Sequence, residues 1–261
     1  MLALLHTRVP TMKYVRRRLV ALGDSISCGE GVGVQVHVAH TWAAVVAHAL
    51  DAELHLLAMR GARVRDVRDV QLDAALAVRA DVATVVIGLN DVSRAGWDAS
   101  RYREDLTAIV TALRDAGTTV LVGRLHDPAR RLPLPAGVRA TLDERIGAVN
   151  ATVDALRGPG VVAFDLGGVP VLQRASGWSV DRVHPGIAGH RGMAIAALEA
   201  LDEHGVHAVR AIALPTLERA PGRMAELAWI ARHGVPYVAK HAKKVRATTG
   251  SWVEHTEQAA S

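Results

Sequence analysis

The sequence predicts an α/β protein built on a parallel sheet with helices on both faces. Short runs rich in β-branched residues alternate with longer stretches of helical period along most of the chain. Half of the 261 residues are hydrophobic, which is enough for one well-buried core. Strict alternation of strands and helices is typical of parallel sheets, because each crossover returns over one face of the sheet.

Five strands are expected, at residues 18–22, 54–58, 83–87, 118–123 and 161–165. Helices are expected between them and after the last strand, at residues 42–50, 64–79, 100–116, 138–156 and 187–201. In the third of these helices, apolar residues recur at spacings of three and four and mark a buried face: Leu106, Ile109, Val110 and Leu113. Aromatic residues are scarce, so the core is expected to consist mainly of Val, Leu, Ile and Ala.

Two regions depart from the alternation. Residues 125–137 contain three prolines and the pair His126-Asp127, and we expect a long surface loop that contacts the substrate as a lid. Residues 204–261 follow the last expected helix. Within them, residues 216–233 suit an amphipathic helix through Leu217, Met224, Leu227 and Ile230. Packing of that helix against the body is the default expectation, and contact with a membrane surface or a partner is the alternative.

Charge is unevenly distributed along the chain. The net charge of +5 combines five basic and no acidic residues in positions 1–20, a net −4 in residues 21–203 and a net +4 in residues 204–261. Basic ends can attract nucleic acid or anionic lipid, but they are more often solvated tails, and no nucleic-acid partner is expected.

The sequence also bears on the compartment. A single cysteine, Cys28, permits no intramolecular disulfide and fits a reducing environment. The first 22 residues lack the pattern of a signal peptide, and no run approaches the roughly 20 apolar residues of a membrane span. We therefore expect a soluble, cytoplasmic protein.

A serine and a histidine at opposite ends of this sequence supply the elements of acyl chemistry. Ser25 follows Gly23 and Asp24 at the exit of the first expected strand, where it suits a nucleophile. His184 suits its base, and Asp181, three residues earlier, suits the carboxylate that orients the imidazole. Taken singly, each piece also fits a turn or a helix cap.

Two further residues suit an oxyanion-binding role. Gly61 and Asn90 each come just after an expected strand, and the carboxyl ends of parallel strands share one edge of the sheet. The backbone N–H groups of Gly61 and Ser25 and the side-chain amide of Asn90 are donors that could hold an oxyanion. The competing interpretations are a helix cap for Asn90 and an ordinary turn for Gly61.

Four blocks together resemble the SGNH hydrolases, the GDSL-type esterase and lipase family. They are Leu22-Gly23-Asp24-Ser25, Arg60-Gly61-Ala62, Gly88-Leu89-Asn90-Asp91 and Asp181-Arg182-Val183-His184-Pro185. They stand in the family's order over residues 19 to about 201, with Ile26 in place of the usual leucine. The resemblance implies a flavodoxin-like three-layer α/β/α sandwich with a five-stranded parallel sheet. It also implies that Ser25, Gly61, Asn90 and His184 fill the four family roles, with Asp181 as the triad acid.

The expected organisation is a basic segment at residues 1–17, an SGNH hydrolase domain at residues 18–203 and a basic, partly helical extension at residues 204–261. The expected function is hydrolysis of a small-molecule carboxylic ester through an acyl-serine intermediate, without cofactor or metal. The pair His37 and His40 has no carboxylate cluster nearby in sequence and is not taken as a metal site. Transfer of the acyl group to another acceptor, and a non-catalytic binding protein, remain the alternatives.

Overall fold

The computed structural model describes residues 16–31, 34–128, 134–213 and 220–234. At its centre lies a five-stranded, all-parallel sheet with the order β2-β1-β3-β4-β5. The strands are β1 (Arg17–Gly23), β2 (Ala52–Leu56), β3 (Val82–Val86), β4 (Thr119–Arg124) and β5 (Val161–Asp165). This is the strand order of the flavodoxin-like folds, so the predicted fold class is confirmed.

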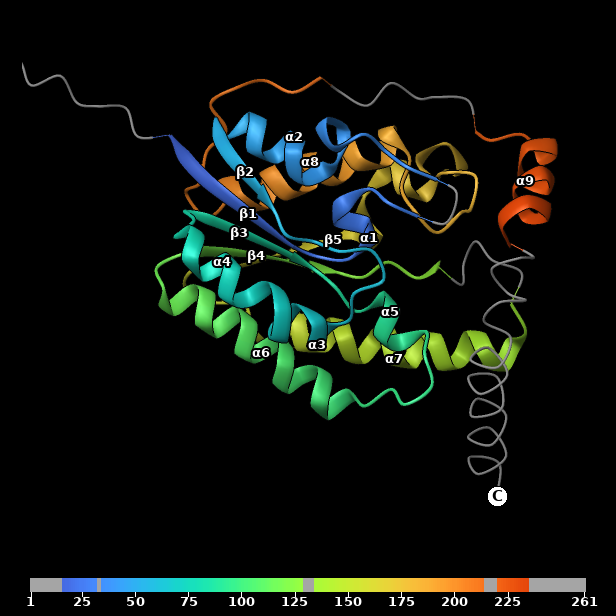
Figure 1. The fold of residues 1–261 in the computed structure, drawn as a ribbon, viewed down its shortest axis with the longest axis horizontal. Helices are drawn as coiled ribbons and strands as arrows, with labels where there is room; N and C mark the ends of the chain where they lie inside the picture. The colour runs from blue at the N-terminus through green and yellow to red at the C-terminus, as the bar shows by residue number, and fades with distance from the viewer. Residues whose placement is uncertain (1–15, 32–33, 129–133, 214–219, 235–261) are drawn as a thin grey trace, which may run out of the picture.

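Helices cover both faces of this sheet, which gives three layers (Figure 1). One face carries α2 (Trp42–Ala49) and α8 (Ile187–Asp202). The other face carries α6 (Ala99–Asp115), α7 (Ala136–Ala155) and the helical stretch formed by α3 (Val64–Asp66), the π-helix η2 (Val67–Gln71) and α4 (Leu72–Val78). Short helices fill the connections: α1 (Ser25–Cys28), η1 (Val38–His40), α5 (Leu89–Val92), η4 (Leu166–Gly168), η5 (Pro170–Gln173) and η6 (Ala175–Gly177).

The two cores lie on either side of β1 and use its residues in alternation. Leu19 and Ala21 belong to the core under α2 and α8, whereas Val20 and Leu22 belong to the core under α4, α6 and α7. All four side chains are fully buried. A strand buried on both faces is expected to read as a continuous apolar run, and that run made β1 easy to predict.

The order of the strands creates the crevice in which the functional residues meet. β1 has β2 on one side and β3 on the other, so the connections after β1 and β3 diverge at their carboxyl ends. Ligands bind at such switch points in open α/β sheets. Ser25 directly follows β1, Asn90 lies in α5 after β3, and Gly61 lies in the connection after β2.

The bounds of the second strand and of the loop before α7 differ from the sequence prediction. The second strand begins at Ala52, two residues earlier than expected. The loop predicted at residues 125–137 ends at α7, which begins with Ala136, and its residues 129–133 lie outside the described residues. His126, expected on a loop surface, is buried, and the centroids of its ring and the Trp178 ring are 4.6 Å apart.

The extension after residue 203 contains a helix, but not over the whole predicted range. Residues 216–219 of that range lie outside the described residues, and α9 (Arg223–Trp229) begins after Pro221-Gly222 and continues as the π-helix η7 (Ile230–Gly234). Contrary to the default expectation of inward packing, Met224, Leu227 and Ile230 are exposed. Over the residues described, no helix has both the length and the apolar character needed to cross a bilayer.

Candidate active site

The turn that presents Ser25 depends on Gly23. Its φ of +133° is one that only glycine readily adopts, and a Cβ there would lie 2.2 Å from the carbonyl oxygen of Val86. The buried amide of Gln71 holds this glycine from both sides, accepting from its N–H and donating to its C=O at 2.9 Å each. Asp24 then caps α1 by accepting from the N–H of Ile26 at 3.0 Å. Ser25 is therefore the first residue of a short helix on a fixed backbone.

His184 is held by the turn that also carries Asp181. One carboxylate oxygen of Asp181 accepts from the backbone N–H groups of Val183 and His184, both at 3.0 Å. Arg182 adopts a left-handed φ of 58°, which makes the turn tight enough for those bonds. At the end of the turn, the N–H of Ser179 donates to the His184 carbonyl at 2.8 Å.

These two supports bring serine, histidine and aspartate into one hydrogen-bonded chain. His184 Nδ1 lies 2.6 Å from the second Asp181 oxygen, and His184 Nε2 lies 3.0 Å from Ser25 Oγ. Asp181 and Ser25 are 7% and 8% exposed, so the chain is shielded from water but open to a substrate. The carboxylate fixes the tautomer in which Nδ1 carries the proton and Nε2 faces the serine as an acceptor.

The predicted oxyanion donors differ in whether they already form a hydrogen bond within the protein. Among the described residues, the N–H groups of Ser25 and Gly61 donate to no protein acceptor. Gly61 has a positive φ of 77°, and an added Cβ there would lie 3.9 Å from Arg94 Nη2, so the backbone of Gly61 lies in an open place. The Asn90 amide instead donates to Asp24 Oδ2 and to the Ala62 carbonyl, both at 3.1 Å.

Buried carboxyl groups lie behind these donors. Burial raises the pKa of Asp24 to about 6, against the opposing effects of the Ile26 N–H, His184 and Asn90. Burial likewise raises the pKa of Asp91 to about 7, although its carboxylate accepts from the N–H of Val64. Neutralisation of either group near neutral pH changes the field beside Asn90.

The structure adds two residues that sequence reasoning missed. Gln71 carries no motif, and only its tertiary contact with Gly23 shows its role. Gly31 lies against the imidazole, since a Cβ at this position would be 2.6 Å from His184 Nδ1. Gly31 also lines a cavity of about 390 Å³ with Glu30, Val34, Gln35 and Arg60, so this cavity adjoins the histidine.

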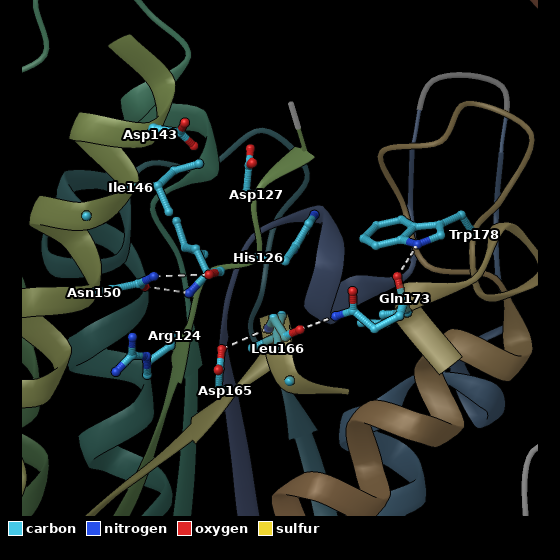
Figure 2. Close-up of a pocket in the computed structure, with 15 residues that line it drawn as sticks. Arg124, His126, Asp127, Asp143, Ile146, Asn150, Asp165, Leu166, Gln173 and Trp178 are labelled. Carbon is cyan, nitrogen blue, oxygen red and sulfur yellow. Dashed lines mark hydrogen bonds between the residues drawn. The ribbon is translucent and has the colours of Figure 1, made fainter. Parts of the chain in front are cut away.

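A second cavity, of about 400 Å³, lies at the carboxyl ends of β4 and β5. Figure 2 shows the His126 and Trp178 rings next to each other, with Asp143 on α7 and Asp127 on the segment that follows β4. Trp178 forms a β-bridge with Pro185, next to His184, so the wall of this cavity is continuous with the turn of the histidine. Polar side chains thus contribute to both cavities, and in the second they alternate with apolar ones such as Leu125, Ile146 and Leu172. Within the part of the chain described, no cluster of three His, Cys, Asp or Glu residues has the arrangement of a metal site.

Comparison with known proteins places this arrangement in a family. The family model described as GDSL-like lipase/acylhydrolase matches residues 21–191. No curated protein matches the chain.

Solved structures share the fold at low identity. An acetylxylan esterase from Geobacillus stearothermophilus is 22% identical with a TM-score of 0.54, and the match covers 71% of this chain and 94% of that one. A G-D-S-L family protein from Desulfitobacterium hafniense DCB-2 is 16% identical with a TM-score of 0.56, covering 69% and 97%.

The matched span of the family model covers well over half of the chain and contains all four sequence blocks. The chain therefore belongs to the GDSL-like lipase/acylhydrolase family and is a hydrolase of carboxylic esters.

Proposed function

We propose that this chain is a serine esterase that works through an acyl-serine intermediate. The observation that carries the proposal is the hydrogen-bonded chain from Ser25 Oγ through His184 to Asp181, with distances of 3.0 and 2.6 Å. A hydroxyl at hydrogen-bond distance from an oriented imidazole is an activated nucleophile. In the structurally similar acetylxylan esterase, the catalytic mutants also replace a serine, a histidine and an aspartate, which supports these roles.

The first half-reaction forms the acyl-enzyme. Ser25 Oγ attacks the carbonyl carbon of the ester while its proton passes to His184 Nε2. The carbonyl oxygen becomes an oxyanion that accepts from the N–H groups of Ser25 and Gly61. Collapse of this intermediate breaks the bond to the alcohol, which takes the proton from His184 and leaves. Asp181 stabilises the imidazolium throughout without taking its proton.

The second half-reaction releases the acid. A water molecule attacks the acyl carbon and gives its proton to His184 Nε2, and His184 returns a proton to Ser25 Oγ as the serine leaves. Asn90 becomes a third oxyanion donor by exchanging its bond to Asp24 or to the Ala62 carbonyl for one to the intermediate. Its present bonds hold the amide in place beside the Ser25 turn.

The cavities favour an ester with polar substituents. Charged and amide side chains dominate the cavity beside the histidine, including Arg60 and Glu30. In the other cavity Asp127, Asp143 and Asn150 share the lining with apolar residues such as Leu125 and Ile146. Hydroxyl groups or charges on a substrate would find hydrogen-bond partners there, whereas a long hydrocarbon chain would leave these groups desolvated. The acetylxylan esterase among the structural neighbours supports a small acyl group on a polar carrier.

Hydrolysis of p-nitrophenyl esters of graded chain length tests the proposal. The wild type is expected to turn over the acetate faster than the palmitate, and Ser25→Ala is expected to lose turnover while its thermal midpoint stays close to that of the wild type. Ser27→Ala is the matched control, since Ser27 lies two residues away and its buried hydroxyl has no hydrogen-bond partner in the described structure. Full activity in Ser25→Ala would overturn the assignment. Product analysis with added alcohols separates hydrolysis from acyl transfer.

A further inference from the structure

The last described helix of the chain, α9, exposes large apolar side chains to solvent. Met224, Leu227 and Ile230, spaced by three residues along α9 and the start of η7, are 78%, 59% and 47% exposed. We call these three residues the apolar face of α9. The residues Glu226, Trp229 and His233, on another side of the helix, are less exposed. A helix of a globular protein normally does the opposite and buries its aliphatic side chains.

Other exposed aliphatic residues of the described structure do not form such a group. Val38, Met59, Val70 and Val209 lie in separate segments and are single exposures of the kind that any protein surface carries. Three large side chains at helical spacing form a contiguous apolar strip, and such strips mark contact surfaces. The apolar face of α9 is therefore a candidate contact surface.

The charge of the C-terminal sequence indicates which occupant this face has. The one carboxylate of α9, Glu226, is paired with Arg182, so it adds little negative potential. Arg232 is an exposed cation of η7, and residues 204–261 contain eight Lys or Arg residues against four Asp or Glu. Four of these cations come after residue 234: Lys240, Lys243, Lys244 and Arg246. An exposed aliphatic helix face within a segment of net positive charge is the combination that binds an anionic lipid surface.

We propose that the apolar face of α9 docks on an anionic lipid surface. Hydrocarbon side chains enter the interface while Arg232 and the net positive charge of the C-terminal sequence attract lipid phosphates. This goes beyond the proposed esterase function and does not depend on it, because docking needs no chemical step.

A direct contact connects the docking helix to the triad. The Arg182 guanidinium donates to both Glu226 oxygens, from Nε at 3.0 Å and from Nη2 at 2.6 and 2.5 Å. Arg182 lies in the tight turn between Asp181 and His184. Figure 1 places α9 beyond the end of the sheet at which α1 and α5 begin. A surface bound by α9 would therefore lie beside the edge of the protein at which Ser25 is presented.

Vesicle co-sedimentation tests the proposal. The full chain is used with Ser25→Ala, so that no lipid is cleaved, and is mixed with vesicles of phosphatidylcholine containing phosphatidylglycerol or of phosphatidylcholine alone. We expect the parent to bind the anionic vesicles. The triple variant, which combines Met224→Ser, Leu227→Ser and Ile230→Ser, is expected to bind them at least about tenfold more weakly. The control combines Val70→Ser and Val209→Ser, which also remove exposed aliphatic groups, and is expected to bind as its parent does.

Several results would overturn the docking proposal. They are no binding to anionic vesicles, equal binding to both kinds of vesicle, or full binding by the triple variant. A dimer that the triple variant dissociates in analytical ultracentrifugation would assign the face to a second copy instead. Hydrolysis of p-nitrophenyl acetate by the triple variant with Ser25 intact, at the wild-type rate, shows that it is folded. The esterase proposal is measured by that second assay, so either proposal can fail without the other.

Discussion

Asp24 is the residue at which stability and activity are expected to oppose each other. It is 1% exposed and accepts from the Ile26 N–H and from the Asn90 amide. Asparagine at this position keeps the cap, because its oxygen can still accept from Ile26. Its own NH₂, however, faces the NH₂ of Asn90, and two donors cannot bond. Asp24→Asn is therefore expected to reduce kcat by about tenfold or more by releasing Asn90.

The effect of the same substitution on stability follows from the pKa. Burial raises the pKa of Asp24 from 3.8 to about 6, so the folded state binds its proton more tightly than the unfolded state. The stability from this group is present below about pH 3.8 and is lost as the pH rises through about 6. A shift of about two units corresponds to about 3 kcal/mol in all, of which about 1.5 kcal/mol falls between about pH 5 and about pH 8. Asparagine does not ionise, so the variant does not lose this stability as the pH rises.

Urea unfolding of wild type and Asp24→Asn at about pH 5 and about pH 8 measures this difference. The variant is expected to gain about 1.5 kcal/mol in unfolding free energy relative to the wild type over that interval. Asp73→Asn removes an exposed carboxylate from α4 and controls for the loss of one negative charge. A difference between Asp24→Asn and wild type that stays constant with pH, or moves toward the wild type, would refute the reasoning.

Three further substitutions test the rest of the site, each read as kcat on p-nitrophenyl acetate beside a thermal midpoint. Asp181→Asn keeps the shape of the turn but removes the carboxylate at 2.6 Å from His184, and is expected to reduce kcat by about 10⁴-fold; a loss under tenfold would contradict its role. Asn90→Ala is expected to reduce kcat by about 10²-fold, and unchanged kcat would exclude Asn90 from the oxyanion hole. Gly31→Ala places a Cβ 2.6 Å from His184 Nδ1 and is expected to displace the ring and reduce kcat by roughly tenfold, whereas Gly158→Ala, where an added Cβ meets nothing within 4 Å, is expected to leave kcat unchanged. Equal kcat in the two glycine variants would contradict the contact.

The fold was largely predictable because its strands are buried on both faces. A short continuous apolar run such as Leu19 to Leu22 is typical of a strand buried on both faces. β2 was misplaced because it is the exception: it lies at the edge of the sheet, and its Glu53 and His55 alternate with apolar residues. The prediction followed the apolar residues up to Ala58 instead. Leu57 and Ala58 do donate to the Ala21 carbonyl, but they lie beyond the end of the strand.

The site was predictable where chemistry and strand ends coincide. Ser25, Gly61 and Asn90 follow three strands whose carboxyl ends meet at one edge, so topology alone brings them together. Gln71 and Gly31 act through contacts made only in the folded chain, with Gly23 and with His184 respectively, and no local pattern announces them.

The orientation of α9 was equally beyond the sequence. An apolar stripe indicates a helix face that avoids water, but it does not say whether that face meets the body or something else. In the structure Glu226 bonds to Arg182 and so directs another side of the helix toward the body.

Covalent capture of the nucleophile tests the central claim most directly. A fluorophosphonate ester reacts with a serine only when a base and an oxyanion site activate it. Intact-mass measurement of the treated wild type is expected to show a single adduct, and peptide mapping is expected to place it on Ser25. Ser25→Ala and His184→Ala are expected to remain unlabelled, whereas Ser27→Ala is expected to be labelled as the wild type is. An adduct on another residue, or an unlabelled wild type that still hydrolyses p-nitrophenyl acetate, would contradict the account.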